Sequence, residues 1–399
     1  SDDEVYYNKN SKTTSTRALR DFHNLFVKKL LITSVSNRGD ILVDLAVGKG
    51  GDLPKWIFAK LKFVFGIDIS PDNIDNRIDG VCARYLRKYK ETRNMPKGLF
   101  VVGNSAINIR NTDAIVGEKN KQITNAIFGV GPKDKEVLGE GVYNQYGVAN
   151  EGFNVCSIQF AMHYMFETQK SLCNFLQNVS EVTKLGGYFI ATCYDGKTVF
   201  NMLKEKDENE SVVIMENDSK MWELTKRYDR NSFEDNVSSL GYAIDVYQES
   251  INKTFREYLV NYEYLTRLFE DYGFVLITKE EAQQLGLPSG SGLFDELYQD
   301  MVNEIERDKY ASKKYGTAPN MTSSEKRISY LNRYFVYKKI RNVDAKKVTM
   351  SLLNQSYEEI VDDNKESELA KKTAISVIKQ QDKTSKTKSK KTRKLVIRE

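Results

Sequence analysis

The sequence predicts an α/β protein with a mostly parallel central sheet and an antiparallel insertion. Three observations support this class. Short apolar runs alternate with helix-periodic segments, which is the pattern of βαβ units in a parallel sheet. A glycine-rich turn follows the first apolar run, as expected where a buried strand passes into a helix. The segment 203–256 breaks the alternation because it is charged and then β-prone, so we expect an antiparallel excursion there.

The expected strands are short apolar runs bounded by glycine or polar turns. The first two, Ile-Leu-Val-Asp-Leu and Phe-Val-Phe-Gly-Ile, are apolar on both faces, which is typical of strands buried in a parallel sheet. In chain order, the expected strands cover residues 41–45, 63–67, 99–102, 153–160, 187–193, 274–278 and 333–338.

The expected helices are segments in which apolar residues recur every three or four positions. The first is the clearest, because Leu19, Phe22, Phe26 and Leu30 form one stripe. In chain order, the expected helices cover residues 16–32, 51–60, 72–92, 168–184 and 258–272.

Three parts are expected along the chain. Residues 1–40 form an N-terminal segment and helix, residues 41–341 the main domain, and residues 342–399 a polar to basic tail. The tail is of low complexity from about residue 382, so we expect it to be disordered from there. Within the domain, the glycine-rich connection 106–152 is long enough to be either functional or partly disordered.

The charge is concentrated in the tail. The whole chain has a formal net charge of +5, from 60 Lys and Arg against 55 Asp and Glu. Residues 383–399 alone carry +7, so residues 1–382 carry −2. A nearly neutral body argues against a protein that binds nucleic acid over its whole surface. The tail is interpreted as a solvated end, with a weak salt-sensitive RNA contact or an import-like patch as alternatives.

Several classes of protein are excluded by composition. The sequence has no run of about 18 apolar residues and no N-terminal signal-peptide pattern. Its four cysteines lie far apart without a C-x-x-C pair, and it has two histidines, so neither disulfides nor a metal site is expected. We expect an intracellular, reducing location: host cytoplasm or virion for a viral protein, with the nucleus as an alternative. Because the chain starts with Ser1, we expect a piece of a longer polypeptide.

The sharpest local motif is the run 43–52, Val-Asp-Leu-Ala-Val-Gly-Lys-Gly-Gly-Asp. Glycines let a backbone approach a ligand closely, and Asp68 ends the next strand, 20 residues after Gly48, where an acid suits a ribose diol. The dinucleotide fingerprint is not met, because Asp52 follows the glycines and would repel a pyrophosphate. The same acid favours the cationic methionine part of S-adenosylmethionine. An ordinary strand–turn–helix joint is the alternative.

A second motif makes the assignment specific. The run 157–167, Ser-Ile-Gln-Phe-Ala-Met-His-Tyr-Met-Phe-Glu, follows the fourth expected strand. Together with the glycine turn, it resembles the mRNA cap guanine-N7 methyltransferase family. The resemblance covers about residues 5–340 and leaves out the tail. The run 191–196, Ala-Thr-Cys-Tyr-Asp-Gly, is more similar to capping enzymes of large DNA viruses than to cellular ones.

The resemblance implies a Rossmann-like class I methyltransferase that uses S-adenosylmethionine and releases S-adenosylhomocysteine. Its substrate would be N7 of the guanine in the GpppN cap of mRNA. The implied partners are 5′-capped mRNA, upstream triphosphatase and guanylyltransferase domains in the same polypeptide, and a stimulatory subunit, with no membrane.

The resemblance also assigns site residues. The residues expected to bind the cofactor are Lys28, Asp44, Ala46, Gly48, Asp52, Asp68, Asn104, Ser105 and Gln159. The residues expected to bind the cap are Tyr7, with Tyr6 as its alternative, Asn24, Lys49, Arg84, Phe160, His163, Tyr164, Glu257 and Tyr334. Lys49 and Arg84 would face the triphosphate. No metal ligand is expected.

The chemistry agrees with this division. Guanine N1–H and N2–H₂ are neighbouring donors that one carboxylate such as Glu257 can accept, and adenine has no such pair. Aromatic stacking adds about 1–3 kcal/mol per base. N7 has a free lone pair, so in-line displacement at the sulfonium methyl requires no general base. We expect no catalytic residue in the strict sense, because orientation alone supplies up to about 7–11 kcal/mol.

The sequence also departs from the family. Ala46 replaces a glycine and is tolerable only where its φ is negative. Asn104 stands where an acid is common, and Arg77 competes with Arg84 for the triphosphate. Ala46 and Asn104 support one alternative, a cap- or partner-binding module with little turnover. A methyltransferase on another RNA is a second alternative, against which the segment 159–164 argues.

Four of the assigned side chains have a structural interpretation as well. His163 could be a satisfied core histidine and Tyr334 a core residue. Lys28 could lie on a solvated helix face, and Glu257 could stabilise the start of the helix expected at 258–272.

Overall fold

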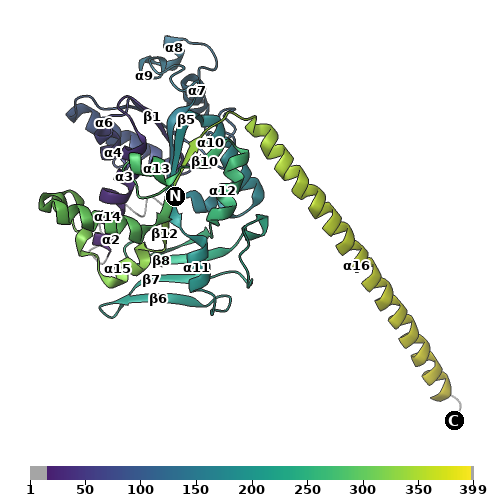
Figure 1. Ribbon diagram of the computed structural model, residues 1–399. Helices are drawn as coiled ribbons and strands as arrows, with labels where there is room; N and C mark the ends of the chain where they lie inside the picture. The colour runs from purple at the N-terminus through teal and green to yellow at the C-terminus, as the bar shows by residue number, and fades with distance from the viewer. Residues whose placement is uncertain (1–15, 397–399) are drawn as a thin grey trace. The chain divides into compact units, whose positions relative to one another are not determined.

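The computed structural model describes residues 16–396, and their side chains except those of residues 356–364, 378 and 381–396. The sequence folds into an α/β domain built on one large sheet (Figure 1). The strand order is β10-β12-β5-β4-β1-β2-β3, with β11 paired to β12. The strands are β1 Ile41–Asp44, β2 Phe63–Asp68, β3 Lys97–Val102, β4 Phe153–Gln159, β5 Thr183–Tyr194, β10 Phe274–Leu276, β11 Ser291–Leu293 and β12 Asn332–Lys339.

The first five strands of this sheet are parallel, which confirms the predicted fold class. β1 pairs in parallel with both β2 and β4, and β12 runs antiparallel to β5. The order therefore reverses between β1 and β4. In open α/β sheets, ligands bind at the carboxyl ends of the strands beside such a reversal.

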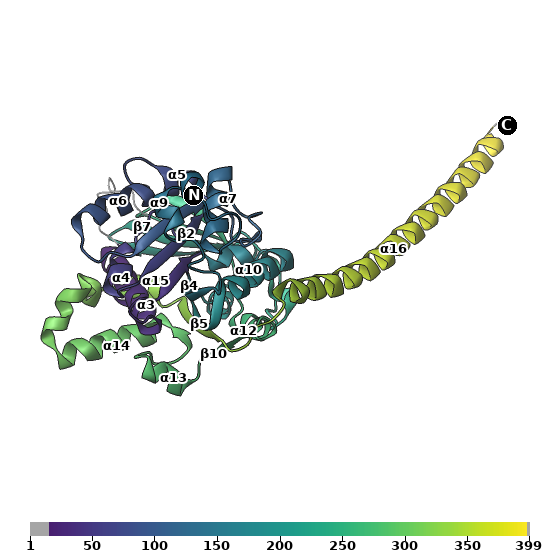
Figure 2. The same ribbon diagram turned by 90° about the horizontal axis from the view of Figure 1, so that it is seen from above.

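Helices cover both faces of the sheet. Figure 2 shows α3 and α4 on one side of the strands and α10 and α12 on the other. The helices are α2 Arg17–Asp21, η1 Phe22–Lys28, α3 Lys29–Val35, α4 Leu53–Phe58, α5 Pro71–Asp75, α6 Val81–Glu91, α7 Glu118–Ile127, α8 Lys135–Leu138, α9 Glu140–Tyr143, η2 Met162–Phe166, α10 Gln169–Val182, α11 Gly196–Met202, η3 Val237–Ser239, α12 Tyr262–Asp271, α13 Lys279–Gln284, α14 Phe294–Arg307, η4 Lys309–Tyr315, η5 Ala318–Asn320, α15 Ser323–Ser329 and α16 Ala345–Val396.

The excursion expected at 203–256 is a separate antiparallel sheet with the order β6-β7-β8-β9. Its strands are β6 Ser211–Glu216, β7 Ser219–Lys226, β8 Ala243–Gln248 and β9 Lys253–Tyr258. The buried Trp222 of β7 joins this sheet to the central one, because its Nε1–H donates to the Tyr194 hydroxyl at 3.2 Å. The predicted antiparallel insertion is confirmed.

The connection 106–152 contains three helices, α7 to α9, and packs on the core. Phe128 contacts Phe65 and Phe153 edge-on, with ring centroids 6.4 and 6.1 Å apart. Its first residues are held by the fully buried Asn178 of α10. The Asn178 amide donates to the carbonyls of Ser105 and Ile107 and accepts the N–H of Ile109. The segment is therefore an ordered part of the domain.

Two expectations about secondary structure are wrong. The helix expected at 72–92 is broken between α5 and α6, because the Asn76 side chain accepts the N–H groups of Ile78 and Asp79 and forms a turn. Glu257 lies on strand β9 and not at a helix start, since α12 begins after the Asn261 cap. Helix α16 runs from Ala345 to Val396, and the disorder expected from about residue 382 stays a prediction. Residues 345–396 contain no Gly or Pro, and a helix satisfies its backbone hydrogen bonds internally.

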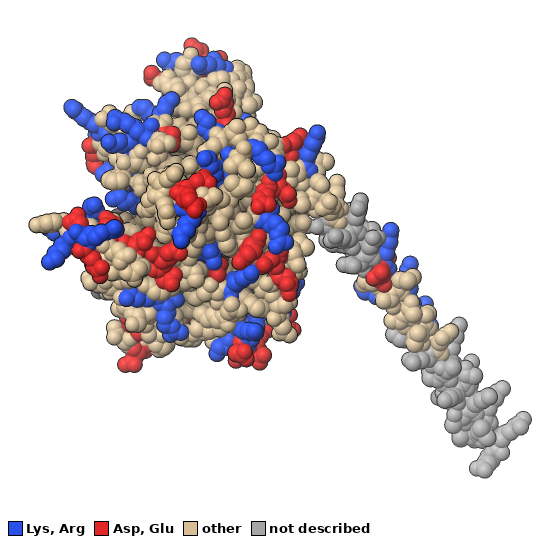
Figure 3. Space-filling view, in the orientation of Figure 1, with Lys and Arg blue, Asp and Glu red and all other residues tan. Residues whose placement is uncertain are grey.

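The chain divides into two compact units, Ser1–Val348 and Thr349–Glu399. On the face of the first unit shown in Figure 3, acidic and basic side chains are interspersed, which agrees with its small net charge. None of the helices that the structure describes is both long and apolar enough to span a bilayer.

We expect Asn178→Ala to lower the free energy of unfolding by about 3 kcal/mol. The change leaves three buried backbone groups without partners, and each costs about 1–3 kcal/mol before relaxation. Thermal and urea unfolding measure the loss. Asn150→Ala, at an exposed position of the same connection, is the control and should change stability by less than about 0.5 kcal/mol. Equal stability of the two variants would contradict the role of Asn178.

Candidate active site at the carboxyl edge of the parallel strands

Four strands deliver polar residues to one edge of the sheet. Asp44 ends β1, Asp68 ends β2, Asn104 follows β3 and Gln159 ends β4. Because these strands are parallel neighbours, their carboxyl ends meet at one edge, next to the reversal between β1 and β4. The structure therefore brings together residues that the sequence assigned to the cofactor.

The glycine turn is shaped by two residues with positive φ. Gly48 has φ 57° and Gly50 has φ 77°, and a Cβ on Gly50 would lie 2.7 Å from Val81 Cγ2. Ala46 is not among the described residues with positive φ, so the condition for a methyl group at that position is met.

Asp68 fixes the turn relative to the second strand. Its Oδ2 accepts the Gly48 N–H at 2.9 Å, and its Oδ1 accepts the Ser70 N–H and the Asn73 amide at 2.9 and 3.1 Å. The carboxylate is 5% exposed. It is therefore a rigid acceptor, and three of its roughly four lone-pair sites are already used, which leaves about one for a further donor.

Asp52 connects the turn to the N-terminal helical run. Its Oδ1 lies 2.9 Å from Lys28 Nζ of η1 and 2.8 Å from Lys55 Nζ of α4. Burial would raise the pKa of Asp52, but the two ammonium groups hold it well below its usual range. Lys28 is 12% exposed, so it is not a residue of a solvated face.

Asn104, Ser105 and Gln159 are held by local hydrogen bonds. Asn104 Oδ1 accepts the Ala106 N–H at 2.9 Å, and Ser105 Oγ donates to the Leu45 carbonyl at 2.7 Å. Gln159 Oε1 accepts the Thr192 hydroxyl at 2.8 Å, and its amide donates to the Ser157 hydroxyl at 3.0 Å. The orientation of each polar group is thus set before any ligand binds.

The run after β4 turns sharply at Phe160, a non-glycine residue with φ 55°. Strained backbone of this kind costs about 1–3 kcal/mol and clusters at functional sites. Helix η2 follows and places His163 Nε2 3.0 Å from Glu257 Oε1. The His163 ring also lies 4.1 Å from the Tyr164 ring. Glu257, 13% exposed, comes from β9, so the antiparallel sheet completes this part of the site.

Tyr334 lies in the core. It is 0% exposed, and its hydroxyl is within 2.8 Å of Ser289 Oγ and 2.7 Å of Glu296 Oε1. Burial raises its pKa. The structure thus agrees with the alternative interpretation of Tyr334 as a core residue and gives it no open surface for a base.

The two cations assigned to the triphosphate are neighbours. The Arg84 guanidinium donates to the Lys49 carbonyl at 3.1 Å, whereas the competing Arg77 is exposed in the turn between α5 and α6. Asn24 is half-buried on η1. Tyr6 and Tyr7 lie outside the described residues.

Sequence reasoning missed His23. Its ring stacks on Phe160 with centroids 5.1 Å apart, and its Nε2 lies 2.8 Å from Ser329 Oγ. Burial, and then the charge of Lys28, lower the pKa of His23 to about 3. A lone histidine on an amphipathic helix has no distinguishing sequence pattern, so the contacts and the lowered pKa of His23 are evident only from the structure.

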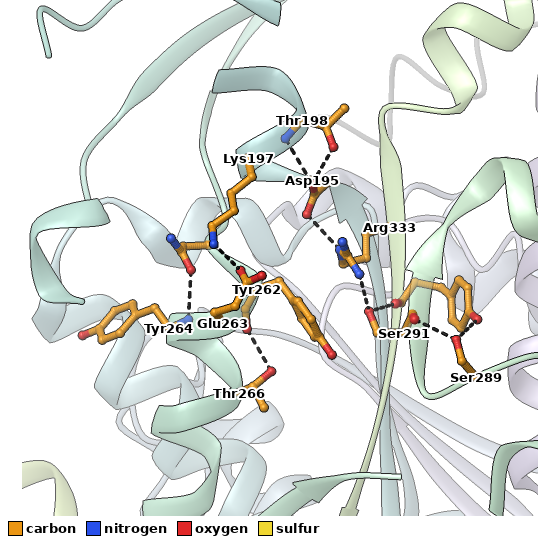
Figure 4. Close-up of polar contacts among 12 residues, drawn as sticks. Asp195, Lys197, Thr198, Tyr262, Glu263, Tyr264, Thr266, Ser289, Ser291 and Arg333 are labelled. Carbon is orange, nitrogen blue, oxygen red and sulfur yellow. Dashed lines mark hydrogen bonds and ion pairs between the residues drawn. The ribbon is translucent and has the colours of Figure 1, made fainter. Parts of the chain in front are cut away.

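A second missed cluster lies at the end of β5 (Figure 4). Asp195 Oδ1 is 2.8 Å from Arg333 Nε, and its Oδ2 accepts the N–H and the hydroxyl of Thr198. The Arg333 guanidinium also donates to Ser291 Oγ and lies 4.4 Å from the centre of the Tyr262 ring. Asp195 is recognisable in the sequence as a helix N-cap, but its pairing with Arg333 is not.

The fold and the edge described above define an α/β protein whose candidate ligand site lies at the topological switch point. The model of the mRNA (guanine-N(7))-methyltransferase domain family matches residues 3–340. The chain belongs to this family.

Several individual proteins are similar to this chain. The probable mRNA-capping enzyme of Acanthamoeba polyphaga mimivirus is 28% identical over 367 residues, which cover 85% of this chain and 29% of that protein. The mRNA cap guanine-N(7) methyltransferase of Saccharomyces cerevisiae is 27% identical over 269 residues, or 65% of this chain and 51% of that protein. The chain therefore spans about half or less of these relatives. Among solved structures, the CcbJ methyltransferase from Streptomyces caelestis is 13% identical, with a TM-score of 0.42, and the match covers 78% of this chain and 88% of that one.

We expect His23 to make stability fall as the pH is lowered. The unfolded chain takes up a proton near pH 6.5, whereas the folded protein excludes it down to about pH 3. Stability is therefore lost progressively below pH 6.5. Between pH 7 and pH 5, wild type should lose about 1–2 kcal/mol more than His23→Gln, measured by urea unfolding. Parallel pH profiles of the two proteins would contradict the assignment.

Proposed function

We propose that the protein transfers a methyl group from S-adenosylmethionine to N7 of the guanine in the GpppN cap of mRNA. The observation that carries the proposal is the contact between the Glu257 carboxylate and His163. His163 follows the edge of the sheet whose carboxylates suit a cationic donor. Family membership supports the same reaction.

The donor site is proposed to consist of the residues at the strand ends and the glycine turn. Their chemistry fits S-adenosylmethionine, because Asp44 and Asp68 are buried carboxylates while the donor carries an ammonium and a sulfonium. Asp68 is proposed to accept a ribose hydroxyl, since three of its neighbours already orient it. When bound, the donor supplies the methyl group. The full proposed set is Lys28, Asp44, Ala46, Gly48, Asp52, Asp68, Asn104, Ser105 and Gln159.

The guanine is proposed to lie against Glu257. A carboxylate offers about four lone pairs, so the contact of Oε1 with His163 leaves acceptors for guanine N1–H and N2–H₂. Phe160 and Tyr164 supply aromatic faces, which also favour the positive charge that develops on the methylated base. His163 is proposed to position Glu257 and to remove no proton.

No general base is required for this reaction, because N7 attacks with its own lone pair. What the chain supplies is orientation, which is worth up to about 7–11 kcal/mol in favourable cases. The hydrogen bonds of Gln159 and Asp68 support this orientation, because they fix both side chains before substrate binds.

The wider setting is also a proposal. Capped mRNA is the proposed partner, with triphosphatase and guanylyltransferase domains upstream and a stimulatory subunit beside them. The mimivirus relative supports the first part, because this chain matches 29% of a protein named as a probable capping enzyme. A reducing intracellular compartment is supported by the four free cysteines. The alternative of a binding module with little turnover was supported by Ala46 and Asn104. The argument from Ala46 no longer holds, because Ala46 is not among the described residues with positive φ.

Incubation with labelled S-adenosylmethionine and GpppA-capped RNA should produce 7-methylguanosine, detected after nuclease digestion of the cap. The nucleophile is N7, so GpppA RNA that already carries N7-methylguanine should accept no further label. Donor binding by a folded protein without any 7-methylguanosine would defeat the proposal and favour the binding module.

Glu257→Gln should lower kcat/KM for capped RNA about 100-fold. The amide keeps the shape but loses a charge-assisted acceptor, and two such hydrogen bonds are worth about 3 kcal/mol together. The Kd for S-adenosylmethionine should be unchanged. Glu208→Gln, at an exposed position ahead of β6, is the control for the charge change. Activity of Glu257→Gln equal to that control would show that the guanine pocket lies elsewhere.

A further inference from the structure

The cation assigned to the cap triphosphate is covered by an acid that no motif includes. Lys49 Nζ lies 3.0 Å from both carboxylate oxygens of Asp79, and 3.6 Å from Asp72 Oδ2. The Lys49 side chain is 4% exposed, while that of Asp79 is 44% exposed. The acid therefore lies between the ammonium group and the solvent.

Asp79 is presented by a built turn and not by a loose loop. Asn76 Oδ1 accepts the N–H groups of Ile78 and Asp79 at 2.9 and 3.2 Å, and the Asn76 amide donates to Asp72 Oδ1 at 3.0 Å. The turn ends at Gly80, where a Cβ would lie 2.6 Å from the backbone N and O of Asn76. This turn is the break in the helix that the sequence had predicted to be continuous.

The pairing is chemically equivalent to phosphate binding. A carboxylate that places two oxygens on an ammonium occupies the position that two oxygens of a phosphate would take. The carboxylate and a triphosphate exclude each other at this position, because both are anions and repel at contact distance. Arg84 lies next to Lys49 and carries a second positive charge for an incoming anion.

We infer that Asp79 is an internal competitor for the cap triphosphate, which must displace it from Lys49 in order to bind. This inference rests on the proposed function for the identity of the anion. A polyanion such as a triphosphate gains contacts with both Lys49 and Arg84 and displaces the acid, whereas a single phosphate gains less. Asp79 is thus a specificity-determining residue that favours the triphosphate bridge over shorter anions.

The probe for this inference is inorganic tripolyphosphate, because it contains neither guanine nor RNA. Its affinity for the full chain is measured by calorimetry at low salt, beside that of orthophosphate. Asp79→Asn should bind tripolyphosphate about fivefold more tightly than wild type, as expected for loss of a partly exposed ion pair. The preference for tripolyphosphate over orthophosphate should narrow.

Two comparisons make the test specific. Asp75→Asn is the matched control, because this exposed residue of α5 gives the same change in charge. It should change affinity less than twofold. In a Lys49→Ala background, Asp79→Asn should give no gain. Thermal unfolding checks that each variant is folded.

An Asp79→Asn variant that binds tripolyphosphate no more tightly than Asp75→Asn would overturn the inference, and so would a gain that persists without Lys49. A different result would contradict the proposed function. If Asp79→Asn tightens tripolyphosphate binding but the protein forms no 7-methylguanosine, the inference about Asp79 stands and the proposed cap methylation is contradicted.

Discussion

The ion pairs between Asp52, Lys28 and Lys55 are the interaction on which the rest of the site depends. They join the N-terminal helical run to the glycine turn of the candidate site. A buried charge without its partner is strongly destabilising, typically by about 3–5 kcal/mol. Because Asp52 is already paired with two ammonium groups, most of the uncompensated negative charge in the proposed donor site comes from Asp44 and Asp68.

Compensation of buried charge within the protein also applies to the part of the site proposed to bind the anionic triphosphate. The two proposed ligands have opposite charge, and at one edge of the sheet each would meet side chains whose charge is already partly compensated. Buried carboxylates are fixed by backbone N–H groups at Asp68, and the buried ammonium of Lys49 is fixed by acids. These partners lower the cost of burying the charges of Asp68 and Lys49 before any ligand binds.

The antiparallel sheet has a role beyond covering the core. Its last strand carries Glu257 to His163, which lies 94 residues earlier in the chain. Trp222 holds the sheet against β5. A domain insertion thus supplies the acid proposed to read the base, while the parallel strands supply the residues proposed to hold the donor. The two proposed ligands are recognised by different layers of secondary structure.

Most of the fold was predictable from local patterns. The alternation of apolar runs and amphipathic helices determines a parallel sheet, and the residues at strand ends must then meet at one edge. Asp68 could be assigned from its place at the end of the second strand, whereas Asp44, Asn104 and Gln159 were assigned from the family resemblance. The proximity of His163 to Glu257 followed from the family resemblance and not from spacing.

The tertiary structure alone decided which side chains remain open to a ligand. Tyr334 is core because Ser289 and Glu296, on segments distant in sequence, take up its hydroxyl. Asp195 pairs with Arg333 across 138 residues, and no local pattern encodes that contact. The physical reason is the same in each case: period and propensity are properties of neighbours along the chain, whereas burial and ion pairing are decided by partners that only folding brings together.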